Sequence, residues 1–112
     1  SKVKHCTYIS LITCTEIPPP IVAIYVHPER FTRDCLLYSK EFVLNLPNVN
    51  LAKEVSYCGT TSGRNVDKFK ETGLTPAKSE KVSVPRIEEC ITHIECKLVN
   101  YFRASQSSST MW

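Results

Sequence analysis

Short blocks of apolar and β-branched residues recur along the chain, and proline or glycine separates them. Residues 7–15 contain neither breaker and are rich in β-branched and aromatic side chains, which predicts a strand. Residues 21–26 form a nearly unbroken apolar run, typical of a strand buried on both faces. The block Glu41–Leu46 repeats this pattern, and Pro47 ends it because proline cannot donate to a strand ladder.

A last strand is predicted within residues 91–102, where the pattern changes. Here Ile94, Cys96 and Leu98 alternate with charged residues. This period of two is that of a half-solvated strand. We therefore expect the face that carries Ile94 to be buried and the charged face to meet solvent.

Three short helices are predicted between the strands. One begins at Thr32, a residue type that caps helix N-termini. A second covers residues 50–58, with Gly59 as its C-terminal stop. A third covers residues 65–71 and ends at Gly73.

These elements predict the fold class. About five strands and three short helices without strict β-α-β alternation indicate an α+β domain, mostly β, with a largely antiparallel sheet that forms a small barrel or part of one. We expect one domain over residues 1–103 of the 112. The Ser-rich segment 104–112 has little to bury, and we expect it to be a disordered tail.

Charge and hydropathy argue against a nucleic-acid partner and against a membrane partner. The chain has 14 Lys and Arg against 11 Asp and Glu, a net charge of +3, and the basic residues are scattered among acidic ones. A nucleic-acid surface would need them on one face. The apolar run at residues 7–15 is too short for a membrane helix of about 20 residues. We expect neither a nucleic-acid nor a membrane partner.

Cysteine use leaves three possibilities open. The six cysteines could be reduced thiols that pack as small hydrophobes, a framework of disulfides, or metal ligands. The chain contains no CxxC pair, and most of the cysteines lie in apolar segments, which favours thiols and a reducing cytoplasm. The six are Cys6, Cys14, Cys35, Cys58, Cys90 and Cys96.

The start of the first helix is a candidate phosphate site. A helix N-terminus has unpaired N–H groups and a partial positive charge. The Thr32 hydroxyl and the guanidinium groups of Arg30 and Arg33 would add donors for an anion. A capped surface helix with solvated arginines is the alternative interpretation.

A second candidate lies in residues 59–76, GTTSGRNVDKFKETGLTP. Glycines and hydroxyl residues precede a helix that carries Lys68, and glycine-rich turns expose N–H groups to anions. The spacing is not that of a Walker loop, and an ordinary loop and helix is the alternative. The chain also lacks the GxSxG, HExxH and GxGxxG motifs, so neither hydrolysis nor Rossmann-type dinucleotide binding is indicated.

Several motifs together resemble one family. They are the PPxVAI strand, the RxT turn, the EFVxN strand, the long run YCGxxSGRxxDKFxxTGLTP, and PxIEEC followed by ECKLV. Over about residues 6–102 the chain resembles the flavin reductase-like, FMN-binding split-barrel family, on its flavoredoxin-like branch. It resembles a member that is shortened at both ends.

The resemblance implies a fold, a cofactor and an assembly. The family fold is a Greek-key split β-barrel, of which this chain would form part, and members usually form homodimers. The implied cofactor is FMN, with FAD as the alternative, and NAD(P)H is the implied electron donor. Because the flavin carries the chemistry, we expect no catalytic acid or base. The cofactor-binding residues implied by the resemblance are Thr7, Ser10, Thr13, Arg30, Thr32, Asn45 and Lys68.

Three functions remain open at this stage. The first is an oxidoreductase that passes electrons from a nicotinamide donor through flavin to a small acceptor. The second is a non-catalytic flavin-binding electron carrier, and the third is a dimeric or strand-exchanged remnant that binds no flavin. Relatives often have Asn at the position of His5 and Trp at that of Leu11, so these departures bear on flavin affinity.

Overall fold

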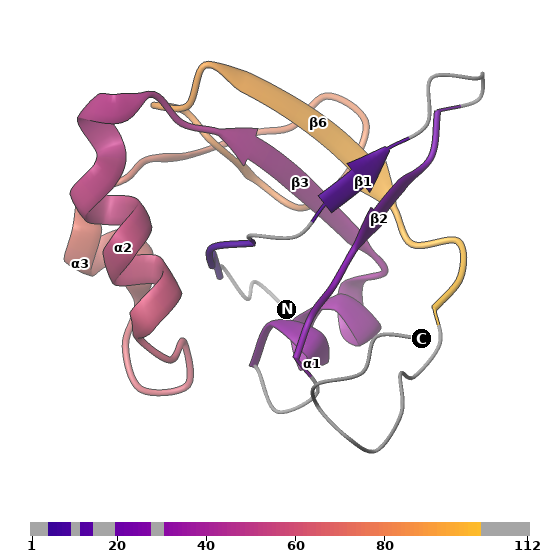
Figure 1. The fold of residues 1–112 in the computed structure, drawn as a ribbon, viewed down its shortest axis with the longest axis horizontal. Coiled ribbons are helices and arrows are strands. Elements are labelled where there is room, and N and C mark those ends of the chain that lie inside the picture. Colours follow the sequence, from indigo (N-terminus) through magenta and orange to yellow (C-terminus); the bar gives the residue numbers. More distant parts are fainter. Residues whose placement is uncertain (1–4, 10–11, 15–19, 28–30, 102–112) are drawn as a thin grey trace.

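The computed structural model describes residues 5–9, 12–14, 20–27 and 31–101 (Figure 1). The predicted tail at 104–112 lies outside these residues. In the described part of the chain, no helix is long and apolar enough to cross a membrane. The elements in chain order are β1 (Ile12–Cys14), β2 (Val22–Ile24), α1 (Phe31–Ser39), β3 (Glu41–Leu46), a 3-10 turn (Val49–Leu51), α2 (Ala52–Thr60), α3 (Lys68–Thr72), β4 (Pro76–Ala77), β5 (Arg86–Ile87) and β6 (Thr92–Lys97).

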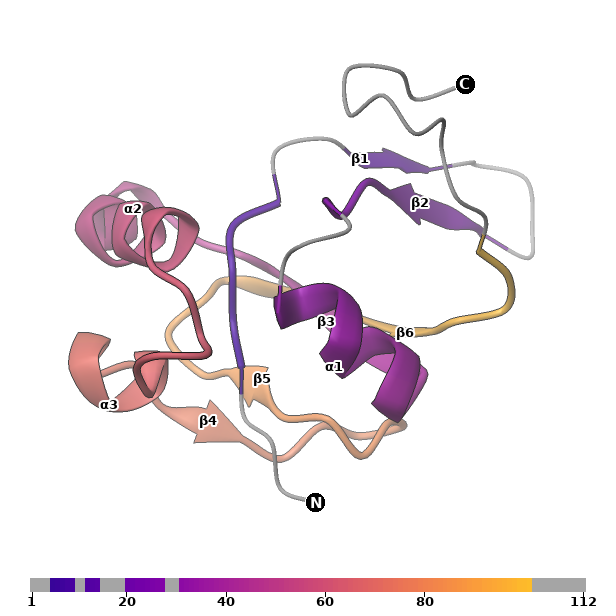
Figure 2. The ribbon, with the colours of Figure 1, turned by 90° about the horizontal axis from the view of Figure 1, so that it is seen from below.

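The described strands pair as three antiparallel two-stranded sheets, β1–β2, β3–β6 and β4–β5. The β3–β6 pair is in the middle, with β1–β2 on one side and β4–β5 on the other (Figure 2). Helices α2 and α3 lie together at one end of the molecule (Figure 1). Helices and strands contribute similar lengths, because α1, α2 and α3 together have 23 residues and the six described strands have 22. The described part is therefore mixed α+β rather than mostly β.

Two of the predicted strands differ from the structure. Of residues 7–15, the described strand is only β1, and residues 5–9 are outside any helix or strand. The run 21–26 contains β2, but Ile21 and Ala23 are exposed. The prediction of burial on both faces was therefore wrong, whereas Glu41–Leu46 is confirmed as β3.

The helices begin and end at residues other than those the sequence predicts, with one exception. Helix α1 begins at Phe31, so Thr32 lies inside the first turn and is not its N-cap. Gly59 lies within α2 and does not stop it. Gly73 does end α3, with a left-handed φ of 78° and its N–H bonded to the Phe69 carbonyl. The left-handed conformation is the one that favours glycine at a helix end.

The central β3–β6 pair has one apolar and one polar face, and the side chains on both faces are half-buried or exposed. Leu44 pairs with Ile94, and Val43 pairs with Glu95. On the apolar face Ile94 is 41% exposed and Leu46 is 42% exposed. The predicted burial was wrong for Ile94, which is exposed, whereas Cys96 and Leu98 are half-buried. Other parts of the chain fold over the polar face instead.

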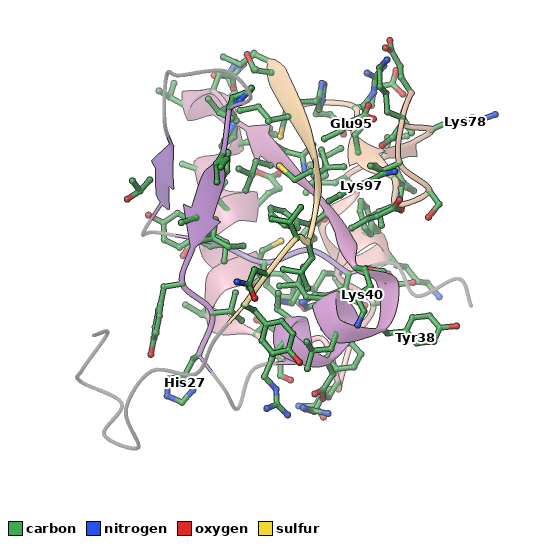
Figure 3. All side chains as sticks on the ribbon, turned by 90° about the vertical axis from the view of Figure 1, so that its right-hand side faces the viewer. His27, Tyr38, Lys40, Lys78, Glu95 and Lys97 are labelled. Carbon is green, nitrogen blue, oxygen red and sulfur yellow. The ribbon has the colours of Figure 1, made fainter. Side chains whose placement is uncertain are left out.

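Side-chain oxygens of the polar face hold these covering residues by their backbone. Glu95 accepts three backbone hydrogen bonds, and Figure 3 shows it projecting from β6 toward the part of the chain that carries Lys78. Glu41 accepts from the Ser83 N–H at 2.9 Å, and Asn45 Oδ1 accepts from the Ile87 N–H at 3.0 Å. The donors to Glu95 are the N–H groups of Glu80, Lys81 and Val82.

Lys40 joins α1 to β3 in a left-handed conformation, with a φ of 62°. Its N–H bonds to the Leu36 carbonyl at 2.8 Å, which ends the helix, and its carbonyl accepts the Leu98 N–H at 2.8 Å. An L-residue in this region is strained by roughly 1–2 kcal/mol, and glycine relieves that strain.

We expect Lys40→Gly to raise the free energy of unfolding by about 1 kcal/mol, measured by chemical denaturation. Lys40→Ala is the matched control, because it removes the same exposed side chain but keeps the strain. If the free energy of unfolding rises in both variants, or in neither, this explanation is contradicted.

Candidate functional site

A cavity of about 510 Å³ lies where the segment before β1 meets three helices. His5 and Thr7 come from that segment, and Phe31 and Thr32 come from the first turn of α1. Residues 59–63 bring the end of α2 and the following loop, and Lys68 begins α3. The two phosphate candidates that the sequence offers therefore contribute to one cavity.

The wall formed by α1 is held by His5. The Thr32 hydroxyl and the His5 Nε2 are 2.6 Å apart and share a hydrogen bond. The Phe31 ring packs edge-to-face with the His5 ring at 5.1 Å between centroids. Thr32 belongs to the first turn of a nine-residue helix, where N–H groups have no partner within the helix. The contact with His5 therefore fixes the hydroxyl beside these N–H groups.

Lys68 links α2 to α3 from the interior. Its side chain is only 2% exposed, and Nζ donates to the Cys58 carbonyl at 2.7 Å. A cation near a helix C-terminus is stabilised by the last carbonyls and by the helix dipole. Asp67 caps α3 by accepting the Lys70 N–H, which fixes where the chain turns inward.

The loop at 59–63 can follow this wall only because residue 63 is glycine. A Cβ built on Gly63 would overlap His5 Nδ1 and lie 3.0 Å from Phe31 Cδ2. Real Cβ atoms do not come as close to another atom as this Cβ would to His5. The loop backbone therefore packs directly against the side chains that position Thr32.

Arg33, which the sequence offers as an anion ligand, pairs with an acid, and so does Arg64. Arg64 lies 2.7 Å from Asp34 and 5.1 Å from the centroid of Phe31, and Arg33 lies 3.3 Å from Asp34. The hydrogen bond from Arg64, followed by that from Arg33, lowers the pKa of Asp34. These contacts join the loop after α2 to α1 at the edge of the cavity.

The seven predicted cofactor residues divide into three groups. Thr7, Thr32 and Lys68 line the cavity. Thr13 is exposed on β1, and Asn45 is on β3, where its amide bonds to Ile87 and Val43 backbone atoms. Ser10 and Arg30 lie outside the described residues. The role of all seven in cofactor binding stays a prediction.

Sequence reasoning missed two features of this region. The sequence marks His5 only as a position where relatives often have Asn, yet its ring shares a hydrogen bond with Thr32. Cys6 and Cys58 lie 52 positions apart in the sequence, and their sulfurs are 3.3 Å apart. Only the fold brings such residues together.

A second cavity, of about 160 Å³, also includes Thr7 and Thr32 and is lined by Tyr8, Ile9, Tyr25, Val26 and His27.

The chemistry of the cavity suits an anion with an organic body. Hydroxyl groups, a helix N-terminus and a buried ammonium are the donors that proteins present to phosphate. The volume lies within the range of small-molecule sites. Over the described residues, no three His, Cys, Asp or Glu side chains group so as to hold a metal ion.

Comparison with known proteins identifies a family and a fold. The flavin reductase like domain family matches residues 2–112. An uncharacterized protein of Archaeoglobus fulgidus is 35% identical over 81 residues, which are 72% of this chain and 46% of that protein. The chain thus spans about half the length of the curated relatives it matches.

Two solved structures share the fold. The flavoredoxin of Desulfovibrio vulgaris is similar with a TM-score of 0.84 and 26% identity, over 88% of this chain and 54% of that one. The FMN-binding domain of a flavin reductases-like enzyme from Shewanella baltica has a TM-score of 0.77 and 19% identity, over 83% of this chain and 49% of that one.

Gly63→Ala tests the packing of the loop against His5. We expect the added methyl group to displace the His5 ring and to lower the free energy of unfolding by about 1–3 kcal/mol, the usual cost of overpacking. Chemical denaturation measures the loss. Asn65→Ala, an exposed change in the same loop, should cost much less, and equal effects of the two would contradict the close packing.

Proposed function

Because this chain belongs to the flavin reductase like domain family, we propose that the cavity beside α1 binds the phosphate end of FMN. The observation that carries the proposal is the convergence of Thr7, Thr32, Lys68 and the loop 59–63 on one cavity. Two separate phosphate candidates in the sequence meet there. The Shewanella baltica domain, of similar fold, is FMN-binding, and we extend that property to this chain.

The residues present fit a phosphate group. The Thr32 hydroxyl and the first-turn N–H groups of α1 would donate to the phosphate oxygens. Lys68 would add positive charge from behind the loop, because its ammonium is buried at the cavity wall. Arg30 lies outside the described residues and stays a predicted contact.

The adjoining cavity has room for more of the cofactor. It includes Thr7 and Thr32, as the first does, and continues toward Tyr8, Tyr25 and His27. We infer that the ribityl chain and ring extend in this direction. FAD is the alternative cofactor, and we further infer that the complete fold is a Greek-key split β-barrel.

Bound flavin would supply hydride and electron transfer, and the protein would bind and orient it. We propose an oxidoreductase that takes electrons from NAD(P)H and passes them to a small acceptor in the cytoplasm. The hydroxyls and the ammonium at the cavity are suited to binding. This chain's own side chains then need supply no acid or base.

We also propose that the protein forms a homodimer. Within the described residues each sheet has only two strands, and a strand without a second neighbour can pair with another chain. At one end of β3–β6, Ile91 donates its N–H to the Leu46 carbonyl, and both side chains are exposed, as is nearby Val49. Such an apolar patch is typical of a protein interface.

The dimer is tested by sedimentation velocity. We expect a species of twice 12.7 kDa, and we expect Ile91→Lys to convert it to monomer because a charge enters the apolar patch. Ile21→Lys, at another exposed isoleucine, is the control and should leave the dimer intact. A wild-type monomer, or equal dissociation of both variants, would contradict the interface.

Phosphate recognition is tested with FMN and riboflavin, which differ only in the phosphate. We expect Thr32→Val to weaken FMN binding by about tenfold or more, since a hydrogen bond to a charged group is lost. Riboflavin affinity should stay unchanged. Fluorescence titration measures both constants, and Thr92→Val, an exposed change on β6, is the control.

The outcomes separate the three functions. Equal losses for FMN and riboflavin would place Thr32 away from the phosphate and contradict the site. FMN binding with NAD(P)H oxidation supports the reductase, and binding without oxidation supports an electron carrier. A folded protein that binds no flavin would overturn the proposed function.

A further inference from the structure

Two cysteines from distant parts of the sequence face each other beside the cavity. Cys6 belongs to the segment before β1, and Cys58 belongs to α2. Their sulfurs are 3.3 Å apart, and either thiol can be the donor of the hydrogen bond between them. A disulfide bond is about 2.05 Å long, so a small closing movement would join them.

The backbone around the pair is fixed from several directions. The Cys58 carbonyl accepts the Lys68 ammonium at 2.7 Å. On the other side, the residues before and after Cys6 line the cavity, and His5 bonds to Thr32 at 2.6 Å. These contacts hold the backbone on both sides of the pair and keep the two sulfurs close together.

The surroundings also favour loss of one proton. The hydrogen bond from Cys6, with the positive charge of Lys68, lowers the pKa of Cys58 to about 7, and the same hydrogen bond raises that of Cys6. Two sulfurs that share a proton titrate as a pair. By contrast, burial raises the pKa of Cys35, Cys90 and Cys96.

We propose that Cys6 and Cys58 form a redox-active dithiol that exchanges with low-molecular-weight disulfides such as glutathione disulfide. Access favours Cys6 as the first sulfur to react, because Cys58 is only 5% exposed while Cys6 is half-buried. Because either sulfur can donate in the hydrogen bond, the anionic pair has a form in which Cys58 holds the shared proton and Cys6 is the thiolate. The lowered pKa of Cys58 makes this the minor form of the pair, and access makes it the form that reacts.

The exchange proceeds in two balanced steps. The Cys6 thiolate attacks one sulfur of the small disulfide, forms a mixed disulfide and releases one small thiolate. Cys58 then loses its proton and attacks the Cys6 sulfur, which releases the second small thiolate. Two protein thiols are oxidised to one disulfide, and one small disulfide is reduced to two thiols, which take up the two protons.

The bond would tie the segment that carries His5 and Thr7 to the end of α2. Both residues line the cavity, as does Gly59, which follows Cys58. Oxidation would therefore lock one wall of the cavity against another. This inference concerns the thiols alone and does not require bound flavin.

The experiment uses the full chain, reduced and freed of flavin, in glutathione redox buffers. After quenching and alkylation, peptide mass analysis should show the loss of two hydrogens at Cys6 and Cys58. Oxidation should also raise the unfolding temperature.

Variants separate pairing from general reactivity. Cys58→Ser should stop at a stable glutathione adduct on Cys6, because the second sulfur is missing. Cys96→Ser, the matched control, should form the Cys6–Cys58 disulfide like the wild type. If glutathione disulfide leaves both thiols free in the folded protein, or if the cross-link falls on other cysteines, the inference is overturned. Because flavin is absent, either result is independent of FMN binding.

Discussion

The burial of the Lys68 ammonium is the constraint on which the rest of the site depends. A charge removed from water is costly unless it is hydrogen-bonded, and Nζ donates to the Cys58 carbonyl near the end of α2. This contact holds the beginning of α3 against the end of α2, so the intervening loop turns back along the cavity. That course brings Gly63 against His5 and Phe31.

The sequence predicts the fold best where local signals agree with tertiary contacts. Glu41–Leu46 is bounded by a left-handed junction and by proline, and it matches β3. Gly73 ends α3 because its own backbone adopts the left-handed conformation. The exposure of Ile94 could not be predicted, because the chain that covers the opposite face of β6 is held to Glu95 by backbone donors about fifteen residues earlier in the sequence. Alternation identifies two faces but not which one the chain covers.

The candidate site could be predicted in part, because some of its residues have a local signal in the sequence. Hydroxyls, glycines and Lys68 mark two stretches that suit phosphate, and Thr7, Thr32 and Lys68 do line one cavity. Nothing local indicates that these stretches meet, and the family resemblance supplied that expectation. Asn45, which the resemblance also implies, does not line this cavity, and its Oδ1 accepts the Ile87 N–H; its role in cofactor binding stays a prediction. The Cys6–Cys58 pair depends on contact across 52 positions, which no spacing rule reveals.

The carboxylates that hold the covering residues make one layer of this protein sensitive to acid. Hydrogen bonds from Ser83 to Glu41, from Thr75 to Glu89 and from the Glu80 N–H to Glu95 hold the pKa values of these carboxyls below their usual range. A lowered pKa contributes stability above the unfolded-state value, and this contribution is lost as the pH falls through the folded-state value. The layer beside the polar face of β3–β6 is therefore held more tightly at neutral pH than in acid, because protonation of these carboxyls removes their contribution to stability.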